Sequence, residues 1–197
     1  EGRIVVDGYT TEVITDMTMN WLLNERDAEK PFMLMYLHKA PHRSWLPAKR
    51  HYTDFTQREF PEPLTLFDEY EGRGTAAKTA ELNILKHMTL TRDNKIYPEV
   101  IKELGINESK NDQNALMNRL GFMDEKQRAS WDSVYMPIND KFKKAYPGMT
   151  EQELMKWKYQ RYMQDYLACI AGIDDELGKV LDYLEETEHN KKTIVIY

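Results

Sequence analysis

Side chains that can hold or protonate an anion are concentrated in residues 38–45. Lys39 carries a fixed positive charge, His42 can exchange a proton near neutral pH, and Arg43 can present a planar fork of N–H groups. Trp45 adds an aromatic face on which a sugar ring can pack. These residue types suit the binding of an oxyanion, either a sulfate or a phosphate. The competing interpretation is a solvated loop with an incidental histidine, and residue types alone leave both open.

Other kinds of reactive site have weaker support in the sequence. His38 and His42 are four residues apart, but Pro41 prevents the helix that would place both on one metal-binding face. The spacing therefore does not predict a metalloprotease-type site. No glycine-rich phosphate loop or G-x-S-x-G motif occurs, and the single cysteine, Cys169, lies in an apolar helical stretch typical of a core. By spacing alone, the sequence offers one anion-binding loop and no nucleophile.

The elements on either side of this loop predict an α/β fold. Residues 10–26 have apolar side chains at helical spacing. Residues 32–38 form an apolar run without alternation, which predicts a parallel strand covered on both faces. The loop 38–45 would then follow the carboxyl end of a strand, which is the edge where open α/β sheets bind ligands.

The rest of the chain is mostly helical in its pattern. Residues 64–149 carry no strand pattern and predict a mostly helical insertion or lid, with breaks near Gly121 and Pro137. Thr150 and Glu153 form a capping box that starts a long helix running to Glu186. Residues 193–197 form a second strand-like run.

Composition excludes several classes of protein. The 197 residues carry a formal net charge of −6, with 41% hydrophobic and 30% charged residues, which is typical of one globular domain. No apolar run approaches the roughly 18 residues that a membrane-spanning helix needs. An acidic chain without a basic block is not expected to have nucleic acid as its main partner.

Three segments, in the same order and spacing, resemble type I sulfatases. PFMLMYLHKAPH at 31–42 resembles the strand and "A-P-H" loop of that family. YLACIAGIDDELGKVLDYL at 166–184 is similar to a sulfatase helix, and KTIVIY at 192–197 is similar to the strand that precedes "T-S-D-x-G". FDEYEGRGTAA at 67–77 resembles bacterial sulfatases that act on N-acetylglucosamine-6-sulfate or related glycans.

The resemblance implies that residues 1–197 are part of a sulfatase catalytic domain with an alkaline-phosphatase-like α/β/α sandwich, and that 64–149 lie within it as the helical insertion. It implies hydrolysis of a sulfate ester on a sulfated carbohydrate, by a formylglycine hydrate nucleophile beside a calcium ion. His42 matches the histidine that contacts sulfate or protonates the leaving group. Lys39 matches less closely, because many relatives lack a lysine there, and Arg43 and Trp45 remain substrate-binding candidates from their residue types.

The sequence also departs from the family pattern. The C/S-x-P/A-x-R motif that yields formylglycine is absent, and so are the aspartates expected to bind calcium. Residues 186–192 replace the usual "G-L-x-D-N" loop. The chain opens at Glu1 and stops inside a strand-like run, so we expect a piece of a larger protein whose remainder supplies these groups. The family is typically periplasmic or secreted.

Two alternatives follow from the same residues. A phosphodiesterase or phosphonate hydrolase of the same superfamily would share the fold and the histidine loop, but it would use a different nucleophile. A non-catalytic glycan-binding or interaction fragment would need no nucleophile at all.

Overall fold

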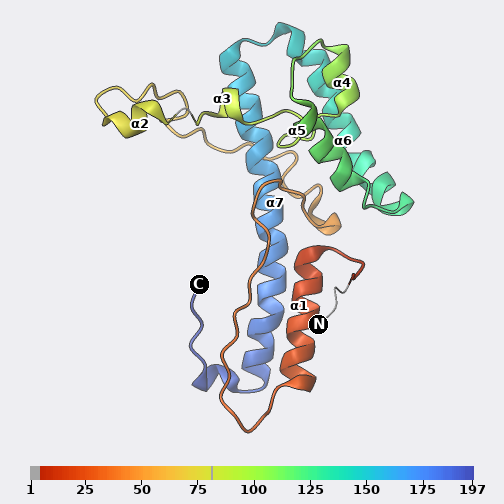
Figure 1. The fold of residues 1–197 in the computed structure, drawn as a ribbon, viewed down its shortest axis with the longest axis vertical. Coiled ribbons are helices and arrows are strands. Elements are labelled where there is room, and N and C mark those ends of the chain that lie inside the picture. The colour runs from red at the N-terminus through yellow and green to blue at the C-terminus, as the bar shows by residue number, and fades with distance from the viewer. Residues whose placement is uncertain (1–4, 81) are drawn as a thin grey trace.

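A single long helix runs through the molecule and contacts most of its other parts (Figure 1). The computed structural model describes residues 5–80 and 82–197. Residues 1–4 of the predicted domain and Glu81 of the predicted helical insertion therefore lie outside the described residues. The long helix, α7, spans Glu151–Glu186 and has 36 residues. None of the helices in the described part of the chain is long and apolar enough to cross a membrane.

The start of α7 follows from a local capping arrangement. The Thr150 hydroxyl accepts a hydrogen bond from the Glu153 backbone N–H at 3.2 Å, and the Glu153 carboxylate accepts one from the Thr150 N–H at 2.8 Å. Both bonds use groups that a helix start otherwise leaves unpaired. The capping box and the last residue, Glu186, are as the sequence predicts.

The first helix packs along the carboxyl-terminal half of α7 (Figure 1). This helix, α1, spans Thr10–Asn20 and continues as a π-helical turn over Trp21–Glu25, which confirms the helix predicted for residues 10–26. The buried residues at this contact form one hydrophobic cluster, namely Leu22, Val180, Tyr183 and Leu184. The cluster fixes the carboxyl-terminal end of α7 against the first helix.

The structure corrects the prediction of two strands. Residues 32–38 and 193–197 are extended, but the part of the chain that the structure describes contains no β-strand. A strand needs a neighbouring backbone to pair with, and neither segment has one among the described residues. The prediction that both faces of 32–38 are covered is also wrong. Phe32, Leu34 and Tyr36 pack toward the cluster, whereas Met33, Met35 and Leu37 are exposed.

Residues 64–149 contain five α-helices among the described positions (Figure 1). They are α2 (Thr75–Thr79), α3 (Ile84–His87), α4 (Pro98–Glu103), α5 (Lys110–Leu120) and α6 (Glu125–Ala145). The break predicted near Pro137 is wrong, because α6 continues through it. Trp131, Tyr135 and Phe142 are fully buried along α6, and their packing outweighs the roughly 3 kcal/mol that an internal proline costs.

The connection between α3 and α4 is unusually buried for a polar segment. Residues 90–96, called the buried turn below, include Thr91, Asp93, Asn94 and Lys95, each at most 1% exposed. Neighbouring helices hold its backbone and side chains: the Asn139 amide of α6 donates to the Lys95 carbonyl, and the Asn94 amide donates to a carbonyl of α7. The turn is therefore a fixed part of the interior.

Candidate functional site

The loop 38–45 lies against the middle of α7 and closes on itself through local hydrogen bonds. The His42 backbone N–H donates to the Lys39 carbonyl at 3.1 Å, and the Trp45 indole N–H donates to the Pro41 carbonyl at 2.9 Å. The rings of Trp45 and of Tyr162 on α7 pack in a T-shaped arrangement with their centres 4.6 Å apart. These contacts give the loop a defined shape without regular secondary structure.

His42 presents one ring nitrogen for chemistry. Its side chain is exposed, and Nδ1 lies 2.6 Å from the Arg43 carbonyl oxygen. Because a carbonyl can only accept, Nδ1 carries the proton of that hydrogen bond. Nε2 is then the nitrogen that can accept a proton or, in the imidazolium, donate one. Lys39 is also exposed, three residues away on the same turn.

Arg43 is engaged by a residue that the sequence analysis did not single out. Its Nε and Nη2 each donate to a carboxylate oxygen of Asp93, both at 2.6 Å. Asp93 is 1% exposed, and this carboxylate raises the pKa of the Arg43 guanidinium further above its usual value. The fork expected to hold an anion is therefore already filled, and Nη1 remains for other partners.

Asp93 belongs to the buried turn, and two neighbours in that turn also contact the loop. The Arg92 guanidinium Nε donates to the Ser44 hydroxyl at 3.3 Å, and the Lys95 ammonium lies 5.8 Å from the centre of the Trp45 ring. No local sequence pattern marks these residues as functional, because T-R-D-N-K has the composition of an exposed turn. The arrangement is visible only after the fold has brought the two segments together.

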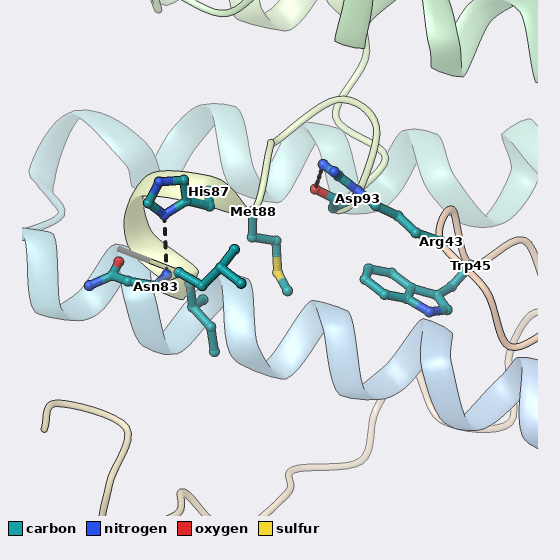
Figure 2. A pocket seen from close by; sticks show the side chains of 8 residues that line it. Arg43, Trp45, Asn83, His87, Met88 and Asp93 are labelled. Carbon is teal, nitrogen blue, oxygen red and sulfur yellow. Dashed lines mark hydrogen bonds and ion pairs between the residues drawn. The ribbon is translucent and has the colours of Figure 1, made fainter. Parts of the chain in front are cut away.

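A pocket of about 260 Å³ opens between the loop and α3 (Figure 2). The Trp45 indole and the Met88 side chain extend toward one another across it, and the Arg43–Asp93 pair lies along one side. Ile84 and His87 add to the lining. Its apolar walls with a few polar groups are typical of sites for small organic ligands, and its volume is close to the lower end of the usual range of about 300–1,000 Å³.

The chain that follows the loop is anchored to α7. The Arg50 guanidinium donates to Asp175 at 2.6 Å, and the two ring nitrogens of His51 lie within hydrogen-bond distance of Asp54 and Asp175. A Cβ built on Gly172 would lie 3.8 Å from the Ala48 Cβ, so the helix and this segment are in close contact there. The anchoring fixes the carboxyl-terminal end of the site.

The described residues do not fit a calcium site or a formylglycine precursor. They contain no group of three or more His, Cys, Asp and Glu side chains placed to hold a metal ion. Cys169 is buried in α7, and burial raises the pKa of its thiol to about 12.

Comparison with known proteins identifies the family. The family model described as Sulfatase matches residues 2–197. The chain belongs to the sulfatase family. The sulfatase assignment agrees with the resemblance carried by the A-P-H loop and the long helix.

Individual sulfatases extend this result. The chain is 39% identical over 197 residues to an N-acetylglucosamine-6-O-sulfatase of Bacteroides thetaiotaomicron, covering 99% of this chain and 33% of the relative. It is 38% identical over 47 residues, 24% of this chain and 9% of the relative, to a sulfatase of Formosa agariphila. This chain therefore spans about a third of the length of the first relative.

A solved structure shows a similar arrangement. The structure of BT4656 in complex with its substrate, D-glucosamine-2-N,6-O-disulfate, aligns with a TM-score of 0.79 at 39% identity. The alignment covers 93% of this chain and 35% of that chain. The fold described above is thus that of a portion of a sulfatase.

Proposed function

We propose that the protein to which this chain belongs hydrolyses a sulfate ester on an amino sugar, and that the loop 38–45 binds the sulfate. The observation that carries the proposal is the exposed His42, which lies on the same turn as Lys39 and directly precedes Arg43, a residue that lines a ligand-sized pocket. Protonated His42 would contact the sulfate and transfer its Nε2 proton to the leaving alcohol oxygen. Lys39 would stabilise the negative charge that develops there.

The pocket supplies the place for the sugar. We place the ring against Trp45, with Met88 opposite, because the C–H faces of a pyranose are apolar and match these side chains. Arg43 would reach the substrate through Nη1, which Asp93 leaves available. The substrate named for BT4656 and the 39% identity to an N-acetylglucosamine-6-O-sulfatase support a 6-O-sulfated glucosamine as the substrate class.

The remaining catalytic groups belong to the rest of the protein in this proposal. Family membership implies a formylglycine nucleophile and calcium, and the described residues offer neither the C/S-x-P/A-x-R precursor motif nor a cluster of metal ligands. The complete domain would form the alkaline-phosphatase-like α/β/α sandwich, with 64–149 as its insertion or lid. A periplasmic or secreted location is proposed on the same basis.

The first test is the His42→Ala variant of the full-length protein. Loss of a general acid lowers turnover by about 10²- to 10⁴-fold, so we expect kcat to fall by at least about 10²-fold. The assay is sulfate release from N-acetylglucosamine-6-sulfate and from glucosamine-2-N,6-O-disulfate, measured by ion chromatography. Unchanged kcat would remove His42 from the reaction.

A matched control and a second substrate class complete the design. His189 lies just beyond the carboxyl end of α7, where it contacts Arg26, so His189→Ala should keep the wild-type kcat. Phosphate diesters and phosphonate esters should be turned over more slowly than the sulfate esters. Faster turnover of either phosphorus ester would favour the phosphodiesterase or phosphonate hydrolase alternative. A wild-type protein that binds the sugar but hydrolyses none of these esters would favour the glycan-binding alternative.

A further inference from the structure

The buried turn meets the loop at three consecutive loop positions. Asp93 holds Arg43 through two hydrogen bonds, Arg92 contacts Ser44, and Lys95 lies over Trp45. These three positions, 43–45, directly follow His42. The segment that carries the proposed proton donor is therefore held from one side by a single rigid piece of the interior.

The carboxylate of Asp93 is itself fixed. Its Oδ2 accepts from the Thr89 N–H at 2.7 Å and from the Thr89 hydroxyl at 3.2 Å, in addition to Arg43 Nη2. The Lys95 ammonium donates to the Asp93 carbonyl at 2.7 Å, which also holds the backbone. A carboxylate with this many donors cannot change rotamer without leaving buried groups unpaired. It can therefore transmit the position of the turn to Arg43.

We infer that Asp93 is a positioning residue for the anion-binding loop and acts through the guanidinium of Arg43. This inference rests on the proposed function, since the loop positioned is the one assigned to sulfate. The bidentate geometry fixes the orientation of Arg43 as well as its distance, and a planar fork is the property that lysine lacks. Because His42 Nδ1 donates to the Arg43 carbonyl, the orientation of the Arg43 backbone also sets the direction of His42 Nε2.

The kinetic test is a double-mutant cycle in the full-length protein with Asp93→Asn and Arg43→Gln. If Asp93 acts through Arg43, each single variant should lower kcat/KM by about tenfold or more, and the double variant should be no worse than the more damaged single variant. Independent roles would make the two losses multiply. Multiplied losses, or full activity of Asp93→Asn, would overturn the inference.

A third variant separates orientation from charge. Arg43→Lys keeps the positive charge but loses the fork, so it should lose about as much kcat/KM as Arg43→Gln. If lysine restored wild-type kcat/KM, Arg43 would act as a simple charge and Asp93 would have no positioning role. Arg43 is partly exposed, so this variant is expected to fold even if a change at Asp93 does not.

A readout independent of activity comes from amide hydrogen exchange. Asp93→Asn should speed exchange of the backbone amides at 39–45, because the loop loses its fixed partner. Thr91→Val is the matched control: Thr91 is fully buried in the same turn, and its hydroxyl has no hydrogen-bond partner in the described part of the chain. Equal acceleration by both variants would mean general loosening and would overturn the inference. If the wild-type protein hydrolyses no sulfate ester, the proposed function fails, but the exchange experiment still decides the role of Asp93.

Discussion

His38 is an imidazole whose two ring nitrogens are both shielded from solvent at the entrance to the loop. Neither nitrogen has a hydrogen-bond partner within the described residues, and the Tyr36 ring meets the imidazole edge to face at 4.4 Å between centres. Burial lowers the pKa of His38, because the charged form loses hydration. The neutral imidazole is thus the form that the folded structure accommodates.

This burial predicts a pH dependence of stability. In the unfolded chain His38 takes up its proton as the pH falls through about 6.5, whereas the folded protein takes it up only at lower pH. The unfolding free energy should therefore fall as the pH drops below about 6.5, down to the folded pKa. His38→Phe keeps a ring but cannot titrate, so it should flatten this slope. The measurement is the thermal midpoint of the full-length protein between pH 7.5 and 5.

The exposed His87 provides the comparison for that experiment. His87→Gln removes an imidazole that is exposed in the folded protein and should leave the slope as in the wild type. An unchanged slope in His38→Phe would show that other groups control the response to acid.

Among the elements, α7 positions the candidate site because its surface packs closely against the segment that follows the loop. Gly172 has room for a methyl group, because the nearest atoms of His51, Ala48 and Tyr9 lie 3.7–3.8 Å from an added Cβ. A larger side chain would push the helix away from the segment that follows the loop. The glycine therefore sets the distance between α7 and residues 48–51.

Two substitutions at Gly172 test this role in opposite directions. Gly172→Ala should raise the unfolding free energy by up to about 1 kcal/mol, because alanine is the better helix former. Gly172→Leu should lower stability, because its branches must displace Ala48 or His51. Denaturant unfolding of the full-length protein measures both. Equal effects of alanine and leucine would contradict the close contact.

The elements differ in how far the sequence predicts them. The start of α7 depends on Thr150 and Glu153, which are three residues apart, so a local pattern is sufficient. The strand predicted at 32–38 depends on a partner backbone, which no local pattern contains. The loop was found from His42 and Lys39, but its restraint by Asp93 was not, because Asp93 is 50 residues from Arg43 in sequence. The low helix propensity of proline likewise led to a wrong prediction at Pro137, because tertiary packing keeps α6 helical there.

At the scale of the molecule, apolar surface is concentrated along the two extended segments. Met33 is 84% exposed, Ile194 is 88% exposed and Ile196 is 90% exposed, and Met35 and Leu37 are also exposed. Extended backbone with unpaired hydrogen-bonding groups and apolar side chains is a template for association with other chains. This surface should govern how residues 1–197 behave when produced alone.

We expect that polypeptide to self-associate in solution. Replacing Met33 and Leu37 with lysine should reduce association, because the charges oppose stacking of this face. Light scattering coupled to size-exclusion chromatography measures the change. Phe122→Lys is the control, since Phe122 is an equally exposed apolar residue on a different surface. A monomeric wild-type segment would contradict the prediction.

The distances along the chain between contacting residues have a consequence for folding kinetics. The loop and its surroundings are joined by contacts that span 50 residues at Arg43–Asp93, 100 at Phe60–Gln160 and 125 at Arg50–Asp175. Contacts of such long sequence separation close large loops and form slowly. During refolding, the helical signal should therefore recover before the loop 38–45 acquires its native shape, so secondary structure would return earlier than the sulfate binding proposed for this loop.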